Sequence, residues 1–364
     1  MTDLSLKLSQ CKRVLVIRYR FIGDTILSVP FLRNLRSFLP EAKIDMLVGP
    51  QSGEVLEGCP YVDQFITFDT TRFHKYDSGQ GKRRSFWHYA AQLRAQHYDL
   101  VFVLKRSWSS AALALLTGAR HRIGYATEGR KLLLSRSVTW NNKIHEVEST
   151  LDVLRAADIP VSDKHLEAWV SAQEKESIAL LVPELKTPKK RILIHAAAAH
   201  PDKMYPLDKW EQVISSVAQK TDSLFFFTGA QQDSDLYEQL GKASGTQFIN
   251  LAGRLTLRQS MALYEQMDVC LCVDSGPAHL SAAVGTPTVT LFGPSDPQRW
   301  RPLGDGNITL YDDSLSCRPC NYRKTCSNRE CLTDFSAQKI VQACFEVLNA
   351  NDGITNPLTS SSSL

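Results

Sequence analysis

Residues 267–293 read MDVCLCVDSGPAHLSAAVGTPTVTLFG, in which two apolar runs are joined by a helix-forming stretch. The first run ends at Val273, and the Asp-Ser-Gly turn at 274–276 leads into a helix with Pro277 in its first turn, where proline is favoured. The second apolar run opens at Thr288. An apolar strand, a helix and a further apolar strand are the repeating unit of a parallel sheet. This segment therefore predicts an α/β fold.

The same alternation of short apolar runs and longer amphipathic segments extends along the rest of the chain. Nearly continuous Val, Ile, Leu and Phe content is typical of strands that helices cover on both faces. We expect strands at residues 13–18, 43–48, 64–68 and 99–104, and again at 191–195, 224–228, 247–250, 268–273 and 288–292. Each series makes a complete small α/β domain, so the sequence predicts two of them.

The length of the chain agrees with two domains, because 364 residues at about 150 per domain suggest two to three. Residues 159–190, between the two series, mix charged residues with three prolines. We place the boundary near residue 170, which gives domains at 1–170 and 171–350. Residues 351–364 end in a serine run and are predicted to form a disordered tail.

Composition excludes several classes of protein. Hydrophobic residues make up 43% and charged residues 22%, as in ordinary globular domains. The longest apolar stretch, near residues 111–116, is far shorter than the roughly 18 residues that a membrane span needs. Residues 1–10 contain no apolar signal segment. We therefore expect a soluble, cytoplasmic protein, and a peripheral position on the inner face of the inner membrane stays open.

Charge is unevenly distributed along the chain. Residues 71–136 hold 13 Lys and Arg against 3 acidic residues, although the net charge of the whole chain is only +4. A cationic segment of this kind indicates an anionic partner, such as a phosphorylated sugar, a lipid headgroup or a nucleic acid. The alternative interpretation is a solvated basic face that binds nothing.

The motif RYRFIGDTILSVP at residues 18–30 follows the first predicted strand. Asp24 would stand at the beginning of a helix, and Pro30 inside that helix is expected to kink it. An Asp at a helix start can simply be an N-cap. The helix start also keeps a carboxylate ionised, as a general base requires, so the two interpretations can coexist.

Two loops that follow strands of the second domain suggest an anion site. Residues 195–206, HAAAAHPDKMYP, have small side chains that allow close approach of a ligand, and Lys203 can supply a point charge to a diphosphate. At the turn 274–276, backbone N–H groups of Ser275 and Gly276 at a helix start would also bind a phosphate. The alternatives are an exposed loop lysine and a capped turn without a ligand.

The segment DSGPAHLSAAVGTPTVTLFGPSDP, residues 274–297, resembles the donor-site segment of glycosyltransferase family 9, the ADP-heptose:lipopolysaccharide heptosyltransferases. The resemblance runs from about Arg13 to Leu332. It implies a GT-B fold: two Rossmann-like domains with a cleft between them. The first domain would bind the acceptor, and the second would bind the nucleotide-sugar.

The resemblance also implies roles for single residues. Asp24 matches the family's Gly-Asp position that holds the proposed catalytic base. Lys203 matches a lysine before an aromatic-Pro pair that contacts the donor phosphates. Asp274 would have a polar partner such as a sugar hydroxyl, and His279, otherwise more typical of a satisfied core histidine, moves toward a donor-site role.

The cysteines suggest a structural element. The chain has nine, an odd number, and no secretory signal is visible, so reduced thiols are the default. Four of them cluster in a Cys-rich loop at residues 317–331: Cys317, Cys320, Cys326 and Cys331. We interpret this loop as a structural staple, held either by zinc or by thiol pairing. Catalytic zinc is disfavoured, because four thiolates would leave no open coordination position.

The basic segment is the candidate acceptor surface. Lys105 and Arg106 follow a predicted strand, and Arg122 lies in a second basic stretch. We expect this face to bind a phosphorylated or Kdo-bearing lipid headgroup at a membrane. Nucleic acid fits less well, since no recognised nucleic-acid module accompanies the charge.

The sequence thus predicts an inverting glycosyltransferase that needs no metal cofactor for catalysis. It would move a heptose from an ADP-heptose-like donor to a lipopolysaccharide-core or related glycan acceptor. Asp24 would act as base, and Lys203 with the backbone of the turn would stabilise the leaving diphosphate. The alternatives are a GT-B nucleotide-sugar epimerase, a family member with a different nucleotide-sugar, and a non-enzymatic zinc-binding protein. A NAD-dependent oxidoreductase is disfavoured, because no G-x-G-x-x-G follows any strand.

Overall fold

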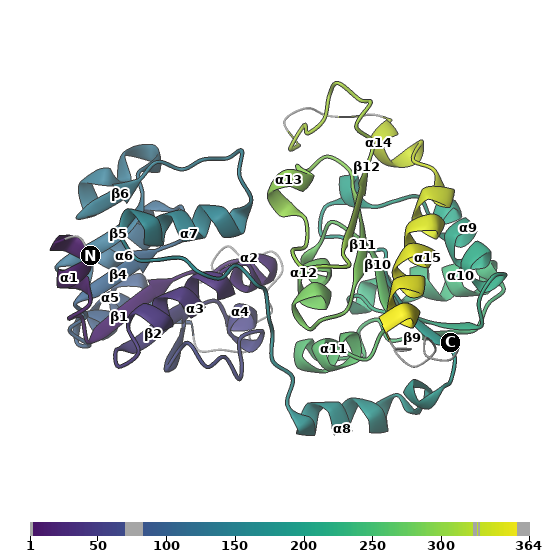
Figure 1. The fold of residues 1–364 in the computed structure, drawn as a ribbon, viewed down its shortest axis with the longest axis horizontal. Helices are drawn as coiled ribbons and strands as arrows, with labels where there is room; N and C mark the ends of the chain where they lie inside the picture. Colours follow the sequence, from purple (N-terminus) through teal and green to yellow (C-terminus); the bar gives the residue numbers. More distant parts are fainter. Residues whose placement is uncertain (1–2, 70–82, 323–325, 327, 355–364) are drawn as a thin grey trace, which may run out of the picture. The chain divides into compact units, whose positions relative to one another are not determined.

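The computed structural model describes residues 3–69, 83–322, 326 and 328–354. The chain divides into two compact units, Met1–Trp169 and Val170–Leu364. Each unit is a parallel α/β domain (Figure 1).

Over the described residues of the first unit, six parallel strands form one sheet in the order β3-β2-β1-β4-β5-β6. The strands are β1 (Arg13–Ile17), β2 (Lys43–Val48), β3 (Gln64–Thr67), β4 (Leu100–Val103), β5 (His121–Tyr125) and β6 (Arg136–Val138). The helices are α1 (Asp3–Leu8), α2 (Ile22–Ile26), α3 (Val29–Phe38), α4 (Pro50–Glu54), α5 (Phe86–Arg94), α6 (Trp108–Leu116) and α7 (Glu146–Ala156), with the 3-10 helix η1 (Thr127–Leu133).

Both faces of this sheet are buried, because successive side chains of a strand point to opposite sides. Leu15 and Ile17 of β1 belong to an apolar cluster with residues of α5 and α6. On the other face, the ring of Phe102 from β4 meets the ring of Phe31 from α3 at a centroid distance of 5.2 Å. The apolar runs of the sequence are therefore explained by burial between two helical layers.

The second unit repeats this plan. Its described residues form a parallel sheet in the order β12-β11-β10-β7-β8-β9. The strands are β7 (Lys190–His195), β8 (Ser223–Phe227), β9 (Phe248–Asn250), β10 (Val269–Val273), β11 (Thr288–Phe292) and β12 (Ile308–Tyr311). The α-helices are α8 (Ala172–Leu181), α9 (Leu207–Ala218), α10 (Ser234–Ser244), α11 (Leu257–Tyr264), α12 (Gly276–Ala283), α13 (Pro297–Trp300), α14 (Glu330–Thr333) and α15 (Ala337–Ile354). Three 3-10 helices, η2 (Pro183–Lys186), η3 (Pro201–Lys203) and η4 (Gln231–Asp233), complete the unit as described.

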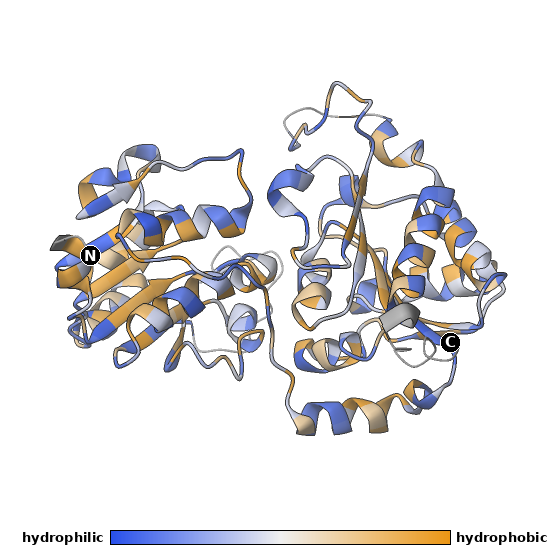
Figure 2. Ribbon diagram, viewed as in Figure 1, coloured by the Kyte–Doolittle hydropathy of each residue, from blue (hydrophilic) through white to orange (hydrophobic). Residues whose placement is uncertain are grey.

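Helices cover both faces of the second sheet as well. In Figure 1, α9, α10 and α15 lie on one side of β10 and β11, and α11 and α12 lie on the other. Figure 2 shows mostly hydrophobic strands beside helices in which hydrophobic and hydrophilic residues alternate. In both units the strand order is that of a Rossmann fold, in which the order reverses between the two central strands.

All nine expected strands are present, and the structure adds three strands that were not expected, β5, β6 and β12. β5 and β6 contain Arg, His and Ser, and β12 is a partly exposed edge strand. Pro30 does not kink a single helix as we expected. The chain leaves helical structure after α2 and begins α3 with Pro30 in the first turn, where its missing N–H costs nothing.

The expected disordered tail, 351–364, also needs a correction at its beginning. Helix α15 continues to Ile354, and residues 355–364 lie outside the described residues.

A pair of leucines tests the packing of the second unit. Leu271 lies in the central strand β10 and is 0% exposed, whereas Leu180 on α8 is 78% exposed. We expect Leu271→Ala to lower the free energy of unfolding by about 2–5 kcal/mol, since it removes buried apolar atoms and leaves a cavity. Leu180→Ala should change it by less than about 0.5 kcal/mol in the same urea titration. Equal effects of the two substitutions would contradict this assignment of the core.

Candidate active site

In the first unit, the predicted base lies where the strand order reverses. Strands β1 and β4 are neighbours, and ligands of such sheets bind at the carboxyl ends of these strands. Asp24 belongs to α2, which follows β1, and Lys105 and Arg106 follow β4. The structure therefore brings three of the predicted residues to one edge of the sheet.

Asp24 is held from two sides. Its Oδ1 lies 3.1 Å from Nη2 of Arg18, and its Oδ2 accepts a hydrogen bond of 3.2 Å from the backbone N–H of Phe21. Phe21 is the N-cap and Asp24 the third residue of the helix, so the N-cap interpretation of Asp24 is wrong. Its carboxylate reaches back to the helix start, and the side chain remains 17% exposed.

Arg18 is the buried centre of this arrangement. Its side chain is 2% exposed, and it lies 3.0 Å from Oε1 of Glu146, which is completely buried. Its Nη1 donates a second hydrogen bond to the carbonyl of Leu104. Burial alone would lower the pKa of Arg18, but the carboxylates of Asp24 and Glu146 raise it above its usual range. Arg18 is thus a fixed charge that orients Asp24.

Glu146 also pairs with Arg106, another of the predicted site residues. Its Oε1 lies 3.0 Å from Nη1 of Arg106, whose guanidinium stacks on the ring of Trp140 at 4.6 Å. Arg106 is therefore built into the same buried network and keeps only part of its surface for a ligand.

Lys105 stands in an unusual environment. Its Nζ lies 5.4 Å from the ring centre of Phe21. Burial lowers the pKa of Lys105 to about 8, with Asp24 opposing the shift and Arg18, Arg20 and Arg106 adding to it. A lysine with this pKa can bind an anion or exchange a proton near neutral pH.

Arg122 does not join this group. It lies near the amino end of β5, and its guanidinium donates to the backbone carbonyls of Leu133 and Ala119. The parallel arrangement puts the amino end of β5 at the opposite edge of the sheet from Lys105. We therefore correct the expectation that these three cations form one surface.

In the second unit, the predicted donor residues also meet at the reversal of the strand order, between β7 and β10. Lys203 ends η3, which follows β7, and its Nζ lies 2.7 Å from Oδ2 of Asp274, the residue after β10. Burial would lower the pKa of Lys203, but Asp274 and Tyr322 raise it above its usual value. Lys203 therefore carries a positive charge beside the turn.

The start of α12 lies next to this pair. Ser275 is the N-cap, but its hydroxyl donates to the carbonyl of Val273 and makes no cap hydrogen bond. A helix start without a side-chain cap favours an anion, because its first N–H groups and the helix dipole are both positive there. Gly276 is the first residue of the helix, and His279 follows on it with a side chain that is 5% exposed.

The Cys-rich loop contributes a residue that the sequence did not reveal. Tyr322 interacts through its hydroxyl with Lys203 and with Ser295, and its ring stacks on His200 at a centroid distance of 4.4 Å. Ser295 in turn donates a hydrogen bond to Asp274. The loop is therefore anchored on the candidate donor site.

The expected zinc site is not assembled. Among the residues that the structure describes, no group of three or more His, Cys, Asp or Glu side chains is arranged to hold a metal ion. The four loop cysteines are free thiols. Cys320 Sγ lies 3.9 Å from the carbonyl of Pro294, Cys326 Sγ accepts from the backbone of Arg329, and Cys331 packs against the core. Each of these three thiols has a different neighbour, although Cys331 interacts electrostatically with the other three loop cysteines and so lies near them.

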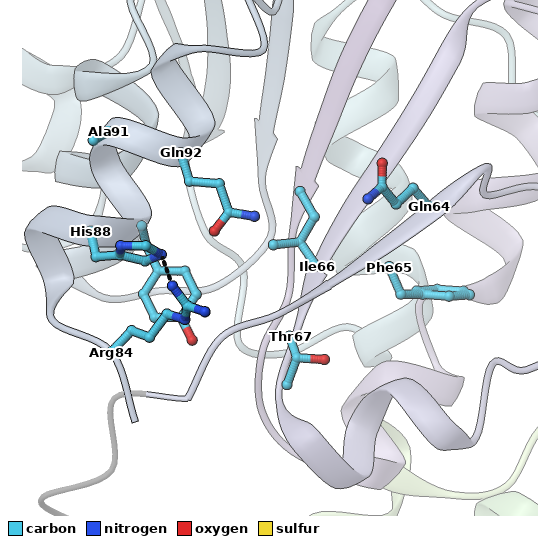
Figure 3. Close-up of a pocket in the computed structure, with 9 residues that line it drawn as sticks. Gln64, Phe65, Ile66, Thr67, Arg84, His88, Ala91 and Gln92 are labelled. Carbon is cyan, nitrogen blue, oxygen red and sulfur yellow. Dashed lines mark hydrogen bonds between the residues drawn. The ribbon is translucent and has the colours of Figure 1, made fainter. Parts of the chain in front are cut away.

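A hollow of about 510 Å³ lies elsewhere on the first unit (Figure 3). β3 and α5 form it, and the side chains of Arg84 and His88 face each other there at 2.8 Å. None of the predicted site residues lines this hollow, so it does not change the assignment of the site to the strand ends.

Comparison with known proteins now decides the family. A model of glycosyltransferase family 9 (heptosyltransferase) matches residues 86–331, which is more than half of the chain. The chain belongs to this family. The predicted enzyme class is thereby confirmed: the protein is a glycosyltransferase.

Relatives of known sequence are similar to this chain over most of its length. It is 26% identical over 341 residues to lipopolysaccharide heptosyltransferase 3 of Escherichia coli K12, covering 90% of this chain and 96% of the relative. It is 28% identical over 320 residues to lipooligosaccharide heptosyltransferase 2 of Haemophilus ducreyi, covering 82% and 88%.

Two solved structures show the fold. A family 9 glycosyltransferase from Veillonella parvula superposes with a TM-score of 0.80 at 21% identity, covering 93% of this chain and 98% of the other. ADP-heptose lps heptosyltransferase II of E. coli superposes with a TM-score of 0.74 at 22% identity, covering 93% and 99%. The predicted GT-B-like fold with two Rossmann-like sheets is confirmed.

The sequence did not reveal two residues of the candidate site in this glycosyltransferase, because their contacts are not local in the sequence. Glu146 lies 128 positions from Arg18, and Tyr322 is an aromatic residue in a loop noted only for its cysteines. Arg18 itself could have indicated a missing acidic residue, because a cation directly after a buried apolar strand requires a charged partner.

Titration of Lys105 tests the first group. After reductive ¹³C-methylation, we expect the Lys105 resonance to titrate near pH 8, well below the usual lysine pKa of 10.5. Asp24→Asn should move the Lys105 pKa lower still, because it removes the carboxylate that favours the charged amine. Asp152→Asn, which removes an α7 carboxylate that pairs with Arg155, is the matched control and should leave the Lys105 titration unchanged. A Lys105 pKa of the ordinary value would contradict the arrangement.

Proposed function

We propose that this glycosyltransferase moves a heptose from an ADP-heptose-like donor to a lipopolysaccharide-core or related glycan acceptor, with inversion at the anomeric carbon. Heptosyltransferases are among its relatives, and a similar fold has been solved as E. coli heptosyltransferase WaaC with ADP and with ADP-2-deoxy-2-fluoro heptose. In this proposal residues 1–170 bind the acceptor and residues 171–350 bind the nucleotide-sugar.

The observation that carries the proposal is the pair of Lys203 and Asp274, 2.7 Å apart beside the uncapped start of α12. A diphosphate would replace the carboxylate of Asp274 as the partner of Lys203. The N–H groups at Ser275 and Gly276 would bind the same phosphates. Asp274 would then accept a hydrogen bond from a sugar hydroxyl, and His279 would line the donor site from the same helix.

In the reaction, the acceptor hydroxyl oxygen attacks the anomeric carbon of the heptose while the bond from that carbon to the phosphate oxygen breaks. The hydroxyl proton goes to Asp24, and the electron pair of the broken bond leaves with ADP. Arg18 keeps the carboxylate of Asp24 in position. Lys203 and the backbone N–H groups stabilise the charge that develops on the diphosphate.

Lys105 and Arg106 are the proposed acceptor-binding residues, and Arg122 is left out because it contacts backbone carbonyls. We propose that no metal cofactor takes part, since Lys203 and a helix start can supply the positive charge that the leaving group needs. The enzyme would act in the cytoplasm, on a glycolipid at the inner face of the inner membrane. Among the described residues, no helix is long and apolar enough to cross a membrane.

Nucleotide binding tests the donor site. We expect calorimetry to show binding of ADP in preference to UDP and GDP. Lys203→Ala should weaken ADP binding by about tenfold to a hundredfold, because it removes a charge-assisted contact to the diphosphate. Lys242→Ala, an exposed lysine of the same unit, should not change it. Preference for UDP or GDP would keep the fold and overturn the choice of donor.

Turnover tests the base. Asp24→Asn should lower kcat by about a hundredfold to ten-thousandfold while ADP affinity stays the same, since it removes only the proton acceptor. Asp152→Asn should retain full activity. Conversion of the donor without any acceptor would point to the epimerase alternative, and full turnover by Asp24→Asn would remove Asp24 as the base.

A further inference from the structure

Large apolar side chains are exposed along one face of helix α6. Trp108 is 50% exposed and Leu115 is 42% exposed. Together with the half-buried Ala112 they occupy positions i, i+4 and i+7, which lie on the same side of a helix. This side points away from the sheet, because Leu113 and Ala114 form the buried side of α6.

Two neighbouring elements extend this apolar face. Helix α5 packs beside α6 (Figure 1) and exposes Trp87 to 70%, and the guanidinium of its Arg94 reaches the carbonyl of Leu116 at 3.5 Å. On the other side, η1 approaches Trp108 so closely that a Cβ at Gly129 would lie 3.8 Å from its ring. The same η1 exposes Leu132 to 88%, the highest value among the exposed large apolar residues of the described chain.

The same elements carry exposed cations. Arg83 lies before α5 and Arg94 on it, Arg120 follows α6, and Lys131 is next to Leu132. The acidic residues between 83 and 136 are Asp99, which lies at the amino end of β4, and Glu128, which pairs with Arg130 at 3.7 Å. The face is therefore cationic as well as apolar.

Exposed Trp and Leu side chains interleaved with Lys and Arg are typical of surfaces that lie in the headgroup region of a membrane. The apolar side chains would insert among the lipid chains, and the cations would remain at the phosphates. Another protein is the alternative occupant, because Trp and Arg are also enriched at protein interfaces, and the experiment below separates the two. We propose that α5, α6 and η1 form a docking face for an anionic phospholipid bilayer, which we call the docking face below.

Vesicle flotation tests this proposal without donor or acceptor, so its outcome is independent of the proposed heptosyl transfer. The wild-type chain should bind vesicles of phosphatidylcholine with about a third phosphatidylglycerol, and bind pure phosphatidylcholine much more weakly. Trp108→Ser combined with Leu132→Ser should lower the partition coefficient by about tenfold or more. Lys131→Gln should lower it by about fivefold at low salt, and this difference should shrink as salt is added.

Matched controls come from the second unit. Leu180→Ser removes a leucine of similar exposure, and Lys242→Gln removes an exposed lysine, so neither should change vesicle binding. Circular dichroism and a urea titration of each variant check that it is folded, and Leu132→Asp provides a single substitution at a side chain with almost no packing to lose. Absence of binding by the wild-type chain, or equal binding by the docking-face variants, would overturn the proposal. So would a dimer that these substitutions dissociate while vesicle binding is retained, because the face would then join two copies of the chain.

Discussion

Parallel strands impose the constraint from which the functional geometry of both units follows. Each connection must return the chain to the same end of the sheet, so the loops after all strands collect at one edge. Where the strand order reverses, at β1 and β4 and again at β7 and β10, neighbouring connections leave toward opposite faces and open a space between them. Asp24, Lys105, Lys203 and Asp274 all follow one of these four strands.

At each of the two sheet edges a cation pairs with a carboxylate, but the more buried partner is the cation in the first unit and the carboxylate in the second. In the first unit, the buried Arg18 is fixed by Glu146, and Asp24 is the more exposed partner. In the second, Asp274 is the more buried partner, and Lys203 is 23% exposed. Removing one member of a buried ion pair costs about 3–5 kcal/mol, because the other charge is left without compensation. The more buried charge of each pair therefore holds its partner in position, and the more exposed charge remains accessible to a ligand.

The elements that the sequence predicted share one property, which is that their signal is local. The strands with continuous apolar runs could be recognised, whereas β5 and β6 could not, because their Arg, His and Ser side chains resemble a basic surface loop. Arg122 was assigned wrongly for the same reason: its charge suggested ligand binding, but its guanidinium donates hydrogen bonds to backbone carbonyls. Asp24 and Lys203 lie in the connections that follow β1 and β7, within contiguous motifs that the sequence shows.

Residues that act through distant partners could not be found from one sequence. Glu146 contributes to the site only because α7 packs beside α3 and brings it to Arg18. Tyr322 reaches Lys203 only because Arg318 ties the Cys-rich loop to the carbonyls of Gly293 and Asp312. The cysteines predicted a staple for this loop, but in the structure an arginine and a tyrosine supply the anchoring contacts.

In the first unit, the proposed docking face is continuous with the sheet edge that carries the proposed acceptor-binding residues Lys105 and Arg106. Arg106 is followed by Ser107, the N-cap of α6, and then by Trp108 at the beginning of the apolar stripe. The hydroxyl of Tyr19, next to Arg18, lies 2.9 Å from the hydroxyl of Ser107 and so ties the start of α6 to the segment that carries Asp24. A glycolipid has its apolar chains in the bilayer and its sugars at the surface. An enzyme that docks through α6 would therefore hold the proposed base and the proposed acceptor-binding cations near the headgroup layer, where the hydroxyl of the proposed glycolipid acceptor would lie.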